Sequence, residues 1–123
     1  MKRLLGLAAV LEAATGLALM IYPPLVTRLL LGDEVSGAGE ALGRLAGFAL
    51  LGLGLACLPG LGSAGATTPA LRALLAYNLL ATLYLFYLGI GGRLVGTLLW
   101  PAVVIHAVLT LLLARAWRAP VGV

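Results

Sequence analysis

Four long apolar stretches limit what this chain can fold into more than any other feature of its sequence. They cover residues 4–22, 41–58, 70–88 and 95–117. Each is close to the roughly 20 apolar residues that a helix needs to cross the hydrocarbon core of a bilayer. A barrel would show alternating polarity, which is absent, and lipid offers no partner to an unpaired backbone amide. The sequence therefore predicts an all-α membrane protein, a single four-helix transmembrane bundle over residues 1–123.

The composition also indicates a lipid environment. The chain is 63% hydrophobic and 10% charged, whereas soluble domains are about 45–50% apolar and about 25% charged. A soluble fold of 123 residues could not bury that much apolar surface. The eight basic residues are scattered along the chain beside the apolar stretches, without the clusters that phosphate binding uses. We expect the lipid bilayer as the main partner, and no nucleic acid.

Prolines and glycines mark the breaks between the stretches. Pro23 and Pro24 end the first helix, and residues 25–31 then form a short apolar segment that stops at Gly32. We expect this segment to lie in the membrane interface. Residues 59–68 predict a glycine-rich loop before the third transmembrane helix.

The first stretch follows Lys2 and Arg3, and so has the outline of a secretory signal peptide. Because Glu12 interrupts its apolar core and apolar residues continue to Ile21, we expect the segment to be kept as a helix of the mature protein.

The basic residues predict an orientation. Five of them would share the side of the two termini: Lys2, Arg3, Arg72, Arg115 and Arg118. Three would lie on the other side: Arg28, Arg44 and Arg93. Because lysine and arginine favour the cytoplasmic side, we predict a multi-pass protein with both termini in the cytoplasm. A still weaker bias would be typical of a dual-topology dimer.

Four polar side chains fall inside the predicted helices: Glu12, Arg44, Asn78 and His106. An ionisable group at the centre of a transmembrane helix costs about 2.5–3.5 kcal/mol, so each needs an explanation. A rise of about 1.5 Å per residue, counted from the side of the termini, places Glu12 and Asn78 roughly 12 Å deep and His106 roughly 13 Å deep. We therefore predict a mid-bilayer polar cluster, either a ligand site or a polar packing core.

Arg44 lies roughly 21 Å from that side and has two candidate partners. Its long side chain could lean toward Glu12, or it could pair with Glu40 four residues earlier on the same helix. Glu12 is either a protonated acid that bonds a neighbouring helix or an acid that exchanges its proton for a ligand.

His106 also has two candidate supports, the hydroxyl of Thr110 one turn later and the amide of Asn78 across the bundle. Because His106 and Cys57 are each the only residue of their type, we expect no metal or haem site within a single chain. A symmetric oligomer could bring two His106 rings together.

Small and aromatic residues also recur at helical spacing. Gly39, Gly43 and Gly47 follow one another every four residues, which predicts a face that another helix approaches closely, within the bundle or in a dimer. Tyr77 and Tyr84 start an aromatic stripe on the third transmembrane helix. The stripe either packs and anchors this helix or joins the histidine in lining a pocket for a flat apolar ligand.

Residues 11–20 carry a family resemblance. Glu12, Gly16 and Leu19, followed by the prolines, resemble the Glu-x-x-x-Gly-x-x-Leu stretches of DoxX-like bacterial membrane proteins. Residues 98–106 likewise resemble small bacterial proteins of this kind. The resemblance implies a compact four-helix protein of the bacterial inner membrane and, for some relatives, quinone or sulfur redox chemistry, hence a quinone-like ligand. Only Glu12 is carried over from the family as a site residue.

The same helix is similar to the first helix of the small multidrug resistance transporters, which are four-helix proteins with one essential glutamate. Glu12, Gly16 and the pair Leu19-Met20 carry this likeness, which implies a proton-coupled exporter working as a dimer. The family's aromatic pattern in the second and third helices is absent, and Arg44 would compete with a cationic drug for the glutamate. The fluoride channels share the size, but their Phe-Ser-Thr-Phe signature is missing.

The sequence thus favours a DoxX-like inner-membrane protein whose polar cluster binds an apolar small molecule or a membrane partner. We expect binding or assembly rather than catalysis, and no residue is predicted to be catalytic. Two alternatives stay open: a small proton-coupled exporter that uses Glu12, and a structural subunit of a larger membrane complex that docks through the glycine face.

Overall fold

A computed structural model describes residues 1–59 and 67–119, and within these ranges the chain is entirely helical apart from its connections. Its helices are α1 (Lys2–Ile21), α2 (Pro23–Leu31), α3 (Ala38–Cys57), α4 (Thr67–Gly91) and α5 (Leu99–Arg118). Four of them, α1, α3, α4 and α5, are long and apolar enough to cross a membrane. The predicted fold class, an all-α membrane protein with four spanning helices, is confirmed.

The break between α1 and α2 has a local cause. Tyr22 leaves the helical conformation between the two helices, with φ −148° and ψ 79°, and Pro23 then stands in the first turn of α2. Proline is tolerated there because its missing N–H would have no partner within the helix. α2 ends at Gly32, whose φ of 79° is left-handed and therefore suits glycine. The short segment predicted at residues 25–31 is thus a helix that begins at Pro23.

The other boundaries shift by a few residues. α4 extends beyond the predicted 70–88 at both ends, and α5 begins at Leu99 rather than at residue 95. Pro101 lies in the first turn of α5, where proline can be accommodated. Of the predicted loop at 59–68, residues 60–66 lie outside the described part of the chain.

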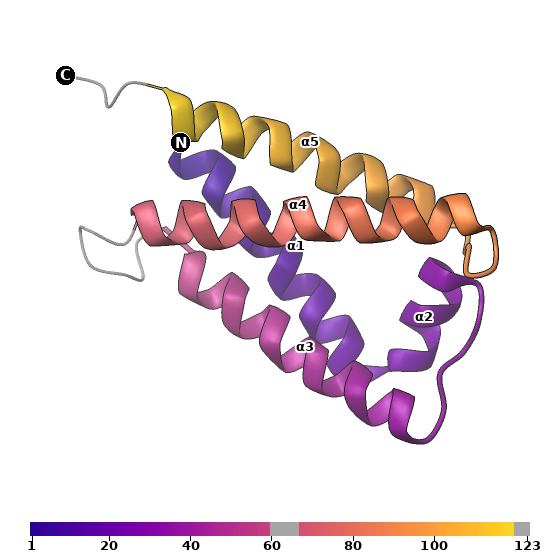
Figure 1. Cartoon of the computed structure of the whole chain (residues 1–123). Helices are drawn as coiled ribbons and strands as arrows, with labels where there is room; N and C mark the ends of the chain where they lie inside the picture. Colours follow the sequence, from indigo (N-terminus) through magenta and orange to yellow (C-terminus); the bar gives the residue numbers. More distant parts are fainter. Residues whose placement is uncertain (60–66, 120–123) are drawn as a thin grey trace.

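The long helices form two pairs, α1 with α3 and α4 with α5 (Figure 1). Glycines let α1 and α3 touch through their backbones. A Cβ atom on Gly47 would lie 2.6 Å from the carbonyl oxygen of Gly16, and one on Gly54 would lie 2.6 Å from the carbonyl oxygen of Ala9. Such contacts are how helices associate where lipid removes the hydrophobic driving force.

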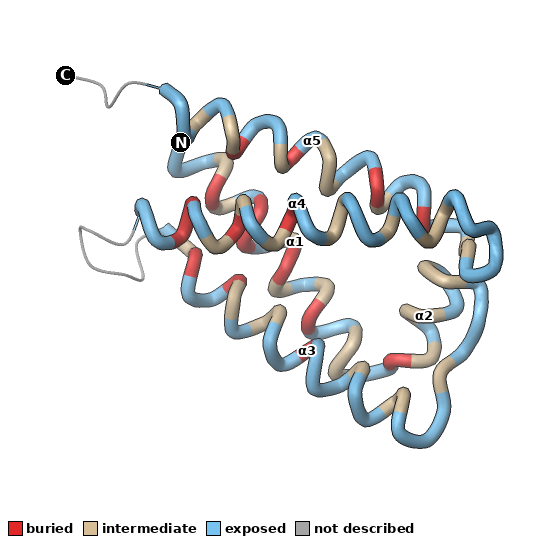
Figure 2. Tube along the Cα trace, viewed as in Figure 1, coloured by how far each residue is buried: buried red, intermediate tan, exposed pale blue. Residues whose placement is uncertain are grey.

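The core lies toward one end of the bundle. We call this the closed end; it is formed by the start of α1, the end of α3, the start of α4 and the end of α5. Its buried cluster consists of Leu5, Ala8, Ala9, Cys57, Ala70, Leu71, Leu74, Leu109 and Leu113. In Figure 2 the buried positions of α4 all lie in its first half.

At the opposite end, which we call the open end, the two pairs diverge and α2 lies between them (Figure 1). Two backbone hydrogen bonds attach α2 there: the N–H groups of Gly96 and Leu98 donate to the carbonyl oxygens of Leu30 and Leu29, at 3.0 and 2.8 Å. These carbonyls belong to the last turn of α2, where no helical partner is available. The connection between α4 and α5 therefore holds α2 in place.

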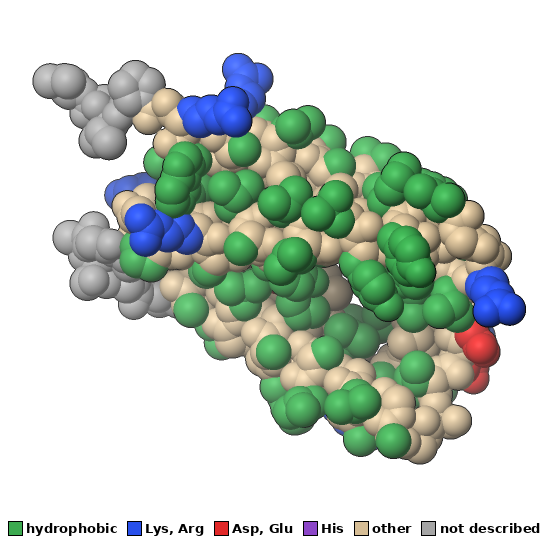
Figure 3. Space-filling view, in the orientation of Figure 1, with side chains coloured by type: hydrophobic (Ala, Val, Ile, Leu, Met, Phe, Trp, Pro, Cys, Tyr) green, Lys and Arg blue, Asp and Glu red, His purple; other side chains and the backbone are tan. Residues whose placement is uncertain are grey.

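The outer surface matches a bilayer. Apolar side chains cover the length of the bundle, and Lys and Arg side chains gather at its two ends (Figure 3). Many large apolar residues point outward, with Leu83 58% and Val104 59% exposed. Lipid contact accounts for this surface, because monomeric soluble proteins rarely expose apolar patches of such extent.

Candidate functional site

A cavity of about 820 Å³ occupies the open end of the bundle. All five helices contribute to its wall, which is apolar except for five residues: Thr15, Thr27, Tyr77, Tyr84 and His106. Figure 3 shows the surface hollowed between α1, α2 and α4. The cavity therefore opens to the side of the bundle, where lipid would lie.

The predicted polar cluster lies beside this cavity. Glu12 of α1 and Asn78 of α4 are both 0% exposed, and His106 of α5 joins them. Nδ1 of His106 lies 2.8 Å from Oδ1 of Asn78 and 3.9 Å from Oε1 of Glu12. The structure thus brings together the three polar residues that the helical rise had placed at one depth, and it places them between the closed core and the cavity.

Asn78 links the histidine to the backbone of α4 through its side-chain amide. Its Nδ2 donates to the carbonyl oxygen of Leu74, one turn earlier in α4, at 2.9 Å. Its Oδ1 faces Nδ1 of His106. Of the two supports considered for the imidazole, the ring uses Asn78. The hydroxyl of Thr110 instead donates to the backbone carbonyl of His106, at 2.7 Å.

Within residues 1–59 and 67–119, the carboxyl of Glu12 has no hydrogen-bond partner. Both of its carboxyl oxygens are buried, and no described residue bonds to either. An ionised carboxylate in such a place would lack every donor that it needs, so the carboxyl is best understood as the neutral acid. The carboxyl of Glu12 therefore lies near Nδ1 of His106, at 3.9 Å, without a hydrogen bond to it.

Arg44 does not take part in the cluster. Its guanidinium pairs with Glu40 at 2.9 Å, and its Nε donates to the carbonyl oxygen of Met20 at 3.3 Å. Of the two partners considered from the sequence, the local pair on α3 is the one that forms. A second surface pair joins Arg28 and Glu34.

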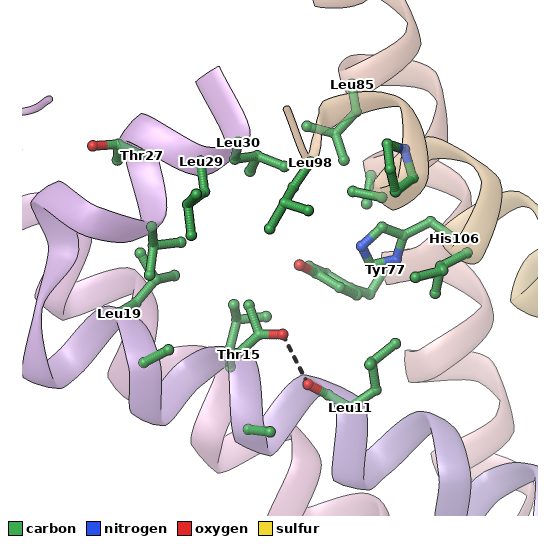
Figure 4. Close-up of a pocket in the computed structure, with 18 of the residues that line it drawn as sticks. Leu11, Thr15, Leu19, Thr27, Leu29, Leu30, Tyr77, Leu85, Leu98 and His106 are labelled. Carbon is green, nitrogen blue, oxygen red and sulfur yellow. Dashed lines mark hydrogen bonds between the residues drawn. The ribbon is translucent and has the colours of Figure 1, made fainter. Parts of the chain in front are cut away.

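The two tyrosines play different parts. Tyr77 packs edge-on against His106, with ring centroids 5.9 Å apart, and its hydroxyl points into the cavity (Figure 4). Tyr84 also lines the cavity, but it is 62% exposed and stacks on Tyr87 at 6.3 Å. Tyr77 thus lies in the interior, whereas Tyr84 and its neighbour Tyr87 lie at the outer surface of the bundle.

The three glycines predicted as one packing face are divided among different neighbours. Gly47 meets α1, whereas a Cβ on Gly43 would lie 3.1 Å from Pro23 and one on Gly39 would lie 3.3 Å from Val35. Gly47 is thus used inside the bundle.

Several residues of the site were not singled out from the sequence. Thr15 lines the cavity, and its position three residues after Glu12 on the same helical face was a usable signal. Gly54, seven residues after Gly47, continues the contact with α1 and could have been found by that spacing. The part of the cavity wall that α2 forms could not be found from residue spacing, because the position of α2 depends on the hydrogen bonds from Gly96 and Leu98.

Comparisons of the chain with protein-family models, with curated proteins and with solved structures found no match.

Proposed function

We propose that this chain is a small inner-membrane protein of the DoxX-like kind that binds an apolar small molecule in the cavity at its open end. One observation carries the proposal: an apolar cavity whose inner wall presents His106, which is hydrogen-bonded to buried Asn78 and lies 3.9 Å from the buried carboxyl of Glu12. A volume of about 820 Å³ lies within the range of small-molecule sites. A few placed polar groups in a mainly apolar wall are typical of such sites.

The lateral opening agrees with a ligand that arrives from the bilayer. An apolar molecule dissolved in lipid could enter between α1, α2 and α4 without crossing water. We propose both termini in the cytoplasm, supported by the basic residues near the closed end. A quinone-like molecule, which the family resemblance implies, is one candidate for this apolar cavity, in the reduced form that carries phenolic hydroxyl groups.

Native mass spectrometry of the protein released from mild detergent tests the proposal. We expect a reproducible extra mass on the wild-type chain. Ala81→Phe should remove this mass because Ala81 lines the cavity. Ala76→Phe is the matched control, since Ala76 lies on the same helix, is exposed and does not line the cavity.

Other outcomes would count against a small-molecule site. A wild-type chain released bare from several detergents and lipids would contradict it. An extra mass that survives Ala81→Phe would place the ligand elsewhere. Stoichiometric co-purification of one protein partner without a small molecule would favour the structural-subunit alternative.

A second candidate, a proton-coupled exporter, is favoured by the carboxyl of Glu12, which no residue in the described part of the chain hydrogen-bonds. An acid that no neighbour engages is free to bind either a proton or a cation in turn. Addition of a lipophilic cation should then release protons from the purified wild-type protein. Glu12→Gln should abolish that release, and release that persists in this variant would exclude Glu12 as its source.

A further inference from the structure

The amide of Asn78 has a fixed orientation, and this determines the chemistry of the whole site. One terminal atom of this side chain lies 2.9 Å from the carbonyl oxygen of Leu74. A carbonyl oxygen only accepts hydrogen bonds, so that atom must be the NH₂ group. The other terminal atom, which faces His106, is therefore the oxygen, and it too can only accept.

The tautomer of His106 follows from this orientation. Nδ1 lies 2.8 Å from the accepting oxygen of Asn78, so Nδ1 must carry a hydrogen and donate it. In a neutral imidazole only one nitrogen carries a hydrogen, which leaves Nε2 with a free lone pair. The ring is thus an acceptor at Nε2.

That acceptor is presented to the cavity. The polar contacts of the ring within the described chain, to Asn78 and Glu12, both involve Nδ1. In Figure 4 the ring nitrogen farther from the backbone points toward the cavity, beside the hydroxyl of Tyr77. The inner end of an otherwise apolar space therefore offers a nitrogen lone pair and a phenolic hydroxyl.

We infer that the cavity selects an apolar molecule with a hydroxyl head, of the phenol or alcohol class, whose O–H donates to Nε2 of His106. This inference rests on the proposed function and specifies its ligand. A head without a donor would leave the buried lone pair unpaired, and sites built around a hydrogen bond reject such analogues strongly. A cationic head fits less well, because the side chain of Glu12 is only 1% exposed and does not line the cavity.

The single histidine of the chain permits a direct test. Protein labelled with ¹⁵N-histidine, freed of any affinity tag and placed in lipid nanodiscs, gives two imidazole nitrogen signals, both from His106. We expect Nδ1 to be protonated and Nε2 unprotonated in the empty protein. The probes are 4-octylphenol and its methyl ether, 4-octylanisole, which share an apolar body and differ in the donor.

The phenol should shift the Nε2 signal toward the hydrogen-bonded position and leave Nδ1 protonated, and the ether should not. The phenol should also bind more tightly than the ether, by about tenfold or more. Thr110→Val should keep the tautomer because its hydroxyl bonds only the backbone carbonyl of His106. Asn78→Leu should lose the tautomer with the hydrogen on Nδ1, because the accepting oxygen is removed. The wild-type spectra alone decide the matter if Asn78→Leu does not fold.

Three outcomes would overturn the inference, and they are distinguishable. A proton on Nε2 of the empty protein would refute the tautomer and with it the ligand class. Equal binding of phenol and ether, with the same effect of both on the two imidazole signals, would leave the apolar site standing without its head-group selection. Binding of neither probe, together with a bare mass spectrum, would remove the proposed function as well.

Discussion

Among single residues, Glu12 conflicts most with the rules for a protein interior. Its carboxyl is buried in the bundle without a hydrogen-bond partner among the described residues, and such a group costs about 1–3 kcal/mol. Replacement by an apolar residue of similar volume removes that cost. Glu12→Leu should therefore raise the free energy of unfolding in detergent by about 1–2 kcal/mol, while ligand binding or proton release is reduced.

The matched control is Glu12→Gln, which keeps the volume and a polar amide and should bring no such gain in stability. Both variants can be compared by thermal unfolding followed by circular dichroism. Loss of stability in Glu12→Leu would show that the carboxyl is bonded in the membrane-embedded protein, and would argue for a packing role.

Among the helices, the contact between α1 and α3 depends on Gly47. A Cβ there would meet backbone atoms, the oxygen of Gly16 at 2.6 Å and the nitrogen of Met20 at 2.8 Å. Backbone cannot swing aside as a flexible side chain can, so Gly47→Ala should lower the free energy of unfolding by about 1–3 kcal/mol. Gly52→Ala, on the same helix with nothing within 4 Å, should be neutral or slightly stabilising. Equal effects of the two would contradict the described packing.

The position of α2 depends on a second glycine. A Cβ on Gly96 would collide with the carbonyl oxygen of Leu29, in the turn that receives the hydrogen bonds from the α4–α5 connection. Gly96→Ala should weaken this attachment by about 1–3 kcal/mol and so reduce binding in the cavity, while the closed core stays folded. Hydrogen exchange should show the amide of Leu98 exchanging faster. Gly91→Ala is the control because nothing lies within 4 Å of a Cβ at this position. Equally fast exchange of the Leu98 amide in Gly91→Ala would contradict the prediction.

For the molecule as a whole, the two ends differ in charge. The open end carries three basic residues balanced by the acids Asp33, Glu34 and Glu40, and two of the three acids are in ion pairs. The five basic residues at the closed end have no acidic residue beside them in the sequence. Because lysine and arginine set the orientation and acids contribute little, the five basic residues at the closed end against three at the open end predict that the closed end faces the cytoplasm.

Cysteine labelling in intact cells checks this orientation. Ser36→Cys, at the open end, should react with a membrane-impermeant maleimide, and Ala119→Cys, at the closed end, should react only after permeabilisation. Both positions are exposed, and the parent protein controls for Cys57, which is buried. The reverse pattern would invert the orientation, and equal labelling would indicate dual topology.

The fold and part of the site could be predicted because they depend on local properties of the chain. The requirement for about 20 apolar residues acts on each stretch separately, so the four spanning helices could be predicted without any knowledge of their neighbours. The fixed helical rise likewise placed Glu12, Asn78 and His106 at one depth. The pairing of Arg44 stayed open, because both of its candidate partners were within reach of a long side chain.

The sequence by itself determined which segments cross the membrane and which polar residues share a depth. Only the tertiary structure decided how each helix is rotated about its axis. In lipid every face of a helix is apolar, so hydrophobic periodicity does not mark the inward side. Rotation is instead set by close backbone contacts such as that of Gly47 with Gly16. These contacts turn Glu12 toward His106, and the hydrogen bonds that hold α2 complete the cavity beside them.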